Sequence, residues 1–321
     1  MAAIYSYEPI GPDREQASEP SPAKPETSPP TAKPLQDSRM RLLSAVNAMP
    51  PLPAVLGQLL GMLNDEGCSS SEIAGMIERD SVLSGTVLRC VNSAYYGVSS
   101  RVSSIRHAVT LLGFATVRNL GLAFSMRRMM QNAQPAGRTY ATYSRHALAC
   151  ALMTQFLAHF TRSPELEAAF AAGLFHDIGK LLVFTTTPEL VPKIIHEWEE
   201  GASYSEAERS VLGVTHAELS AAVVNSWKLP EQIELAARFH HDPASATEGH
   251  ADAPGSPPSL AWLVHAANAA VKHAVFEAIS SPRRPPDDPL ELFQKLSLGD
   301  QLPDILEQFQ AQFQDVQAAF G

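Results

Sequence analysis

The stretch Leu174-Phe175-His176-Asp177-Ile178-Gly179-Lys180-Leu181 sets a histidine and an aspartate side by side in an otherwise apolar segment, residues 168–184. Apolar residues recur along this segment with the spacing of a helix rather than a strand, which predicts a buried helix. Ionisable side chains in such a place cost free energy unless they are paired, hydrogen-bonded or bound to a metal. The pair is therefore either a structural pair of the core or part of a site.

Four further histidines are candidates for a common site with this pair. His146 comes before it, and His216, His240 and His241 come after it. Neutral imidazoles with one carboxylate form a ligand set for iron, manganese or zinc, and such ions activate water for attack on a phosphate. The other interpretation of His146 is a core side chain with satisfied hydrogen bonds, because it falls on the inward stripe of a predicted helix, residues 140–160.

Two other residues bear on catalysis. Lys180 follows His176 by one helical turn, where an ammonium group is placed to contact a phosphate oxygen. Asn268 occupies the inward stripe of a predicted helix, residues 260–279, that would otherwise supply a second carboxylate. No glycine-rich phosphate loop accompanies the cluster. The residues alone leave a structural cluster, a metal site and a metal-dependent hydrolase as alternatives.

The composition narrows the class of protein. The 321 residues are 45% hydrophobic and carry a net charge of −10, so the chain lacks the basic face that nucleic acid or anionic lipid needs. The cysteines Cys68, Cys90 and Cys150 form no close pair, which fits a reducing compartment and offers no thiolate zinc site. No apolar run approaches a membrane span, and the N-terminus lacks the layout of a signal peptide. We expect a soluble cytoplasmic protein with no nucleic-acid or membrane partner.

Proline and glycine divide the chain into parts. Residues 1–37 are rich in Pro, Ser, Thr and Glu and predict a disordered arm, because closely spaced prolines stop helices and sheets from propagating. Residues 38–130 and 138–281 show helical periodicity and are separated by a polar linker. Residues 282–321 predict a helical tail after a proline-rich break.

The tail carries a short heptad seam. Its apolar residues follow steps of four and three: Leu302, Leu306, Phe309, Phe313, Val316 and Phe320. The seam has fewer than three repeats, which is too short for an independent coiled coil. We expect it to pack on the body of the chain; a homodimer contact through this helix is the alternative.

Two sets of motifs, in consistent order along the chain, resemble those of a known family. One set resembles the HD superfamily of metal-dependent phosphohydrolases. It consists of His146, residues 173–180 (GLFHDIGK), residues 213–216 (GVTH) and residues 227–230 (WKLP). The other set resembles the HDOD family, the HD-related output domains of bacterial signalling proteins. It consists of residues 51–53 (PLP), 91–97 (VNSAYYG) and 105–113 (IRHAVTLLG). The resemblance covers roughly residues 40–280. It implies an all-α fold, with an N-terminal helical bundle packed on an HD-like helical subdomain within residues 38–281.

The same resemblance implies a site and a role. Metal-site positions of HD enzymes, the cyclic-dinucleotide phosphodiesterases above all, correspond to His146, His176, Asp177, His216, His240 and His241. The closing aspartate of those enzymes corresponds to Asn268, whose amide oxygen is a poorer ligand, and their Gly-Tyr-Pro element is missing after Asp242.

HDOD modules are generally regarded as lacking demonstrated hydrolase activity. The resemblance therefore implies a non-catalytic module of bacterial signal transduction that acts through contacts with signalling proteins and has a degenerate HD-type pocket. The alternative is a metal-dependent phosphohydrolase of cyclic dinucleotides or other nucleotides, in which Lys180 contacts a phosphate.

Overall fold

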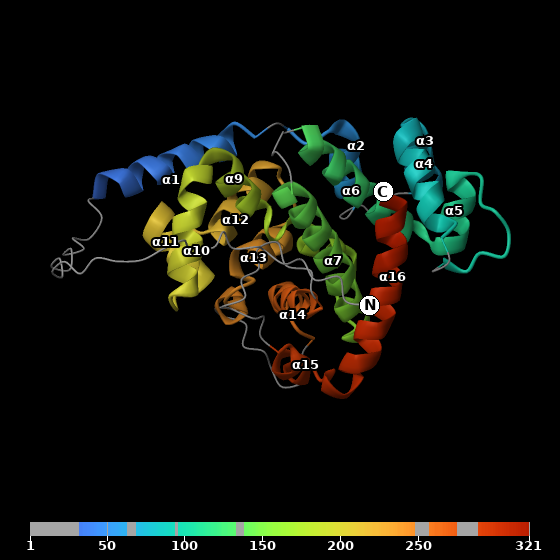
Figure 1. The fold of residues 1–321 in the computed structure, drawn as a ribbon. Coiled ribbons are helices and arrows are strands. Elements are labelled where there is room, and N and C mark those ends of the chain that lie inside the picture. Colours follow the sequence, from blue (N-terminus) through green and yellow to red (C-terminus); the bar gives the residue numbers. More distant parts are fainter. Residues whose placement is uncertain are drawn as a thin grey trace, which may run out of the picture.

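The computed structural model describes residues 32–49, 51–62, 69–93, 96–132, 138–247, 257–274 and 288–320. Every regular element in these ranges is a helix, and none of their residues lies in a strand, which confirms the all-α prediction (Figure 1). Most of the predicted arm, residues 1–31, lies outside the described residues. So do residues 133–137 of the polar linker and residues 275–287 before the tail.

Five helices form the N-terminal half: α2 (Ala54–Gly61), α3 (Ser70–Glu78), α4 (Ser81–Val91), α5 (Ile105–Leu112) and α6 (Phe114–Asn132). Three of them begin at a short polar side chain that accepts hydrogen bonds from the first free N–H groups of the helix. Ser69 does so for α3, Asp80 for α4 and Ser104 for α5. Gly113, at φ 82°, then separates α5 from α6.

Eight helices form the HD-like half: α7 (Arg138–Phe160), α8 (Leu166–Phe175), α9 (Ile178–Thr186), α10 (Val191–Glu199), α11 (Tyr204–Leu212), α12 (His216–Ser226), α13 (Glu231–Phe239) and α14 (Leu260–His273). Helices α8 and α14 pack along α7, and α13 packs on α8, α12 and α14. Helix α12 also packs on α9. One hydrophobic core runs through this half and the N-terminal half.

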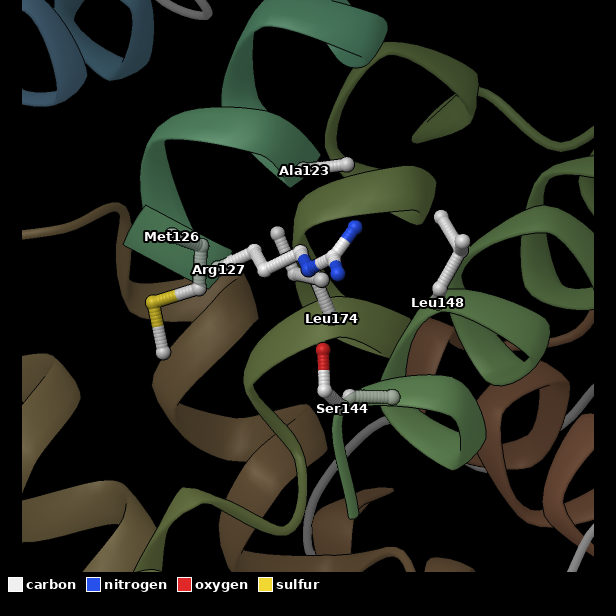
Figure 2. Close-up of a pocket in the computed structure, with 7 residues that line it drawn as sticks. Ala123, Met126, Arg127, Ser144, Leu148 and Leu174 are labelled. Carbon is white, nitrogen blue, oxygen red and sulfur yellow. The ribbon is translucent and has the colours of Figure 1, made fainter. Parts of the chain in front are cut away.

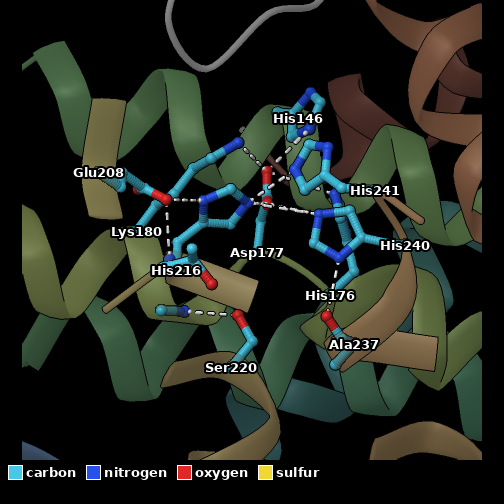
Figure 3. Close-up of polar contacts among 12 residues, drawn as sticks. His146, His176, Asp177, Lys180, Glu208, His216, Ser220, Ala237, His240 and His241 are labelled. Carbon is cyan, nitrogen blue, oxygen red and sulfur yellow. Dashed lines mark hydrogen bonds and ion pairs between the residues drawn. The ribbon is translucent and has the colours of Figure 1, made fainter. Parts of the chain in front are cut away.

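The structure interrupts the single helix predicted for residues 168–184. Helix α8 ends at Phe175 and α9 begins at Ile178, so the His-Asp pair lies in the turn between them. At the break, Asp177 leaves the helical region with φ −107° and ψ 10°, and its carbonyl accepts a hydrogen bond of 2.9 Å from the backbone N–H of Lys180, three residues further on. The turn places both side chains among His146, His216 and His240 (Figure 3).

The apolar segment that contains this turn, Leu166–Thr186, is long and apolar enough to cross a membrane, contrary to the expectation from sequence. However, 89% of its most apolar part is buried inside the protein. Such burial identifies a core segment of the fold rather than a membrane span.

Helix α1 (Ala32–Asn47) differs from the expectation in its start and its packing. It begins inside the predicted arm, with Pro34 in the first turn, where proline costs no intrahelical hydrogen bond. Its main packing partners are α9, α11 and α12 of the HD-like half. Leu42 and Val46 are its buried apolar residues. An ion pair of 2.7 Å between Arg41 and Glu189 attaches it beside the end of α9.

The C-terminal tail consists of α15 (Leu290–Lys295) and α16 (Leu302–Phe320). Helix α16 lies against α4 of the N-terminal half and α7 of the HD-like half (Figure 1, red). Within its seam, Phe309, Phe313 and Val316 are fully buried. The tail thus packs on the body and connects the two halves.

Candidate metal centre

Asp177 lies at the centre of a group of buried histidines (Figure 3). Its Oδ2 atom lies 3.4 Å from Nε2 of His146 and 3.3 Å from Nε2 of His176. Its Oδ1 atom lies 3.2 Å from Nε2 of His216 and 3.5 Å from Nε2 of His240. All five side chains are 0% exposed, so the carboxylate joins two groups of imidazoles within the core.

His241 extends the group around Oδ1. Its Nε2 atom lies 2.9 Å from Nε2 of His216, which is itself 3.4 Å from Nε2 of His240. His241 is the exposed member of this group. The structure therefore brings together in space the predicted residues His146, His176, Asp177, His216, His240 and His241.

Four parts of the fold position these side chains. His146 projects from α7, and His176 and Asp177 form the turn between α8 and α9. His216 is the first residue of α12, whose start is fixed by a capping box between Thr215 and Glu218. His240 and His241 directly follow α13. The site exists because α7, α9, α12 and α13 meet at the turn.

Backbone carbonyls fix the orientation of two imidazoles. Nδ1 of His176 lies 2.8 Å from the carbonyl oxygen of Gly173, and Nδ1 of His240 lies 2.8 Å from that of Ala237. A carbonyl only accepts, so Nδ1 carries the proton in both rings. Burial lowers the pKa of His240 to about 3, so this ring is neutral and its Nε2 presents a lone pair to Asp177. Burial likewise lowers the pKa of His146 to about 4.

Glu208, on α11, orients His216 and was not among the residues that the sequence singled out. Its Oε2 accepts a hydrogen bond of 2.9 Å from the backbone N–H of His216 and lies 2.5 Å from Nδ1 of the same residue. Burial lowers the pKa of His216, but the charge of Glu208 and the hydrogen bonds to Asp177 and Glu208 together outweigh it, so the pKa is raised. The sequence signal that could have identified it is helical spacing, because Glu208 shares the inward face of α11 with Val211 and Leu212. A second carboxylate therefore belongs to the site.

These donors fit a first-row transition-metal ion. Oδ1 of Asp177 and Nε2 of His176 are buried without a hydrogen-bond partner. Donors that share one ion at about 2.1 Å lie about 3 Å apart, and the separations around Oδ1 run from 2.9 to 3.5 Å. Metal-bound histidines usually donate their other ring N–H to a carbonyl or carboxylate, as His176, His216 and His240 do here.

Lys180 takes a different place from the one that catalysis would give it. It is 6% exposed, and its ammonium group donates to Oδ2 of Asp177 at 2.7 Å. The same nitrogen lies 5.5 Å from the centre of the Tyr204 ring. The side chain thus pairs with the central carboxylate. Asn268 is buried on α14, and its side-chain oxygen accepts no hydrogen bond.

A small cavity lies between α6, α7 and α8, apart from the histidines (Figure 2). Its volume of about 20 Å³ holds about one water molecule. Arg127 and Ser144 supply its polar groups, and the rest of its lining is apolar. It offers no room for a substrate.

The chain matches the model of the HDOD domain over residues 49–243, more than half of its length, and it belongs to the HDOD family. An uncharacterised protein of Treponema pallidum is 27% identical over 210 residues, which cover 63% of this chain and 39% of that protein. The uncharacterised protein YuxH of Bacillus subtilis is 27% identical over 125 residues, 39% of this chain and 30% of YuxH. The chain thus spans about two fifths, or less, of the length of these relatives.

Solved structures share the fold. A candidate phosphohydrolase of Shewanella amazonensis has a TM-score of 0.66 at 24% identity, covering 88% of this chain and 98% of that one. An HDOD domain protein of unknown function from Geobacter sulfurreducens has a TM-score of 0.65 at 21% identity, covering 85% and 89%. A candidate signal transduction protein of Marinobacter aquaeolei has a TM-score of 0.65 at 20% identity, covering 88% and 66%. Their similarity confirms the HD-like helical architecture.

The Glu208→Gln variant is expected to bind metal about 10- to 100-fold more weakly, because residues that orient a ligand histidine contribute on this scale. Glutamine keeps the shape of the side chain but removes the charge at 2.5 Å from Nδ1 of His216. Zinc titration in competition with a chromophoric chelator measures the change. The control is Glu231→Gln, at an exposed position at the start of α13. Equal affinities in the two variants would show that Glu208 has no part in the centre.

Proposed function

We propose that the chain is a non-catalytic regulatory module of bacterial signal transduction, which holds a metal ion in its histidine cluster and acts through contacts with partner proteins. The observation that carries this proposal is the closed state of the cluster: Asp177 and four of its histidines are fully buried. Phosphoester hydrolysis needs access for both substrate and water. The arrangement supports a structural or sensing centre instead.

The position of Lys180 adds to this argument. In a phosphohydrolase this ammonium group would meet the substrate phosphate, yet here it pairs with Asp177 at 2.7 Å. Freeing it for substrate would break a buried ion pair, which is costly. The net charge of −10 would also repel a polyanionic nucleotide at long range.

When bound, an ion in this cluster supplies positive charge and Lewis acidity. His216, His240 and His241 would hold it with Asp177, while Glu208 keeps His216 in place. Its binding would fix the turn between α8 and α9 relative to α12 and α13. A cytoplasmic location fits this role, because the module then meets soluble signalling proteins.

A metal-dependent phosphohydrolase is the second candidate. The specific observation in its favour is the Glu208–His216 pair, since carboxylate–histidine–metal arrangements are common where a metal activates water. His241, which is exposed, would then mark the side from which a substrate enters.

Purified protein loaded in turn with manganese, iron or zinc is expected to turn over neither cyclic dinucleotides nor other phosphoesters. Folded His146→Ala and His176→Ala variants are expected to restore the phenotype of a deletion strain as well as the unaltered protein does. Circular dichroism on the same preparations checks that each variant is folded. Metal-dependent turnover that disappears in both variants, together with complementation, would establish the enzyme instead.

A further inference from the structure

A sulfur atom lies beside His146, one of the histidines near Oδ2 of Asp177. Cys150 lies one helical turn after His146 on α7, so the two side chains point to the same side. Its Sγ atom lies 3.5 Å from Nε2 of His146. The donor atoms of His146, Cys150 and His176 all lie within 4.8 Å of one another, and all three residues are buried. The fold thus places a thiol beside these histidines, which the spacing of the cysteines in the sequence did not indicate.

An unpaired atom in this group points to a ligand. Nε2 of His176 is buried and has no hydrogen-bond partner, although its ring is held by Gly173 through Nδ1. The lone pair left on Nε2 faces Oδ2 of Asp177 at 3.3 Å, where two electron-rich atoms repel each other. A cation among these donors would remove that repulsion.

We propose that Cys150, with His146, His176 and Oδ2 of Asp177, forms a sulfur-containing site for Zn²⁺ or a similar thiophilic divalent ion, next to the nitrogen-rich group at Oδ1. Two imidazoles, one thiolate and one carboxylate suit a tetrahedral zinc site. The proposal deepens the metal-holding role proposed above and rests on it. It makes Cys150 the residue that decides which metal this side of the centre accepts.

The local charges explain why a thiolate is needed. The ammonium group of Lys180 lies 2.7 Å from Oδ2, so the shared carboxylate already has one positive neighbour. A divalent ion beside it would leave this buried group with excess positive charge if all remaining donors were neutral. On binding, the thiol of Cys150 loses its proton to solvent and a metal–sulfur bond forms, which supplies the second negative charge.

Cobalt substitution tests the site directly, because Co²⁺ bound to a thiolate gives a sulfur-to-metal charge-transfer band in the near ultraviolet. Metal-free protein is titrated with Co²⁺ and its spectrum recorded. The Cys68→Ser/Cys90→Ser variant retains Cys150 as its one cysteine and is expected to keep the band. Cys150→Ser and Cys150→Ala are expected to lose it. The variant without Cys68 and Cys90 keeps the test decisive even where a substitution at Cys150 prevents folding.

The outcomes distinguish a failure of the sulfur-containing site from a failure of the proposed function. Cobalt that binds to the double variant without a sulfur band would overturn the role of Cys150 and leave the metal-holding role standing. Folded protein that binds no cobalt would overturn both. Phosphoester turnover, in contrast, would overturn the non-catalytic role and leave the sulfur site intact.

Discussion

The Gly179→Ala variant is expected to lose about 3 kcal/mol or more of unfolding free energy. A Cβ atom on Gly179 would collide with the backbone carbonyl of His216 and lie 2.9 Å from Cβ of Leu219. A backbone carbonyl cannot rotate away as a side chain can, so α9 and α12 would have to separate. That movement would also displace His216 from Asp177. Urea denaturation measures the loss, and metal titration measures the effect on the centre.

Gly75→Ala is the matched control for this prediction. Gly75 lies inside α3, and a Cβ atom there would meet no other atom within 4 Å. Alanine in a helix interior is then expected to stabilise the protein by about 0.5–1 kcal/mol. Similar denaturation midpoints for the two variants would show that α9 and α12 do not pack as closely as the structure indicates.

The helices were predictable because their signals are local. Capping residues such as Ser69, Asp80 and Ser104 and the break at Gly113 lie next to the elements they delimit. The spacing of apolar residues in the tail also predicted that this helix packs on the body of the chain. The break at His176 and Asp177 was hidden, because an apolar segment of helical spacing continues on both sides of it. The packing of α1 on the HD-like half depends on contacts between distant segments, which periodicity does not report.

The candidate site likewise contains residues that the sequence identifies and residues that only the fold brings in. The adjacent histidine and aspartate stood out because polar residues are rare in such an apolar segment. Glu208 and Cys150 did not, since each is an ordinary residue of its own helix and acquires a role only where α11 and α7 meet the turn. The contact between Lys180 and Asp177 was not predicted either, because Lys180 was expected to contact the phosphate of a substrate. Which side chains face one another is set by tertiary packing.

The Asp177→Asn variant is expected to lose about 3–5 kcal/mol of unfolding free energy even in metal-free protein, because it leaves a buried charge without its partner. The buried ammonium group of Lys180 donates to Oδ2 of Asp177 at 2.7 Å, and asparagine would present it with a neutral amide. Burial raises the pKa of Asp177, but its interactions with His176, Lys180 and His146 together lower it more, so the pKa lies well below the ordinary 3.8. This stabilisation is therefore present above the pKa of the unfolded chain and is lost as the pH falls through the folded one.

A double-mutant cycle with Lys180→Met isolates the part due to the ion pair. Methionine keeps much of the buried length of lysine but carries no charge, so it does not require the carboxylate. The double variant Asp177→Asn/Lys180→Met is expected to be more stable than Asp177→Asn alone, with a coupling energy of about 1 kcal/mol or more. Urea denaturation of the four proteins after treatment with a chelator gives this quantity. Additive changes in unfolding free energy would mean that water solvates the ammonium group of Lys180 when the carboxylate of Asp177 is lost. The centre would then be more open than the closed cluster on which the non-catalytic proposal depends.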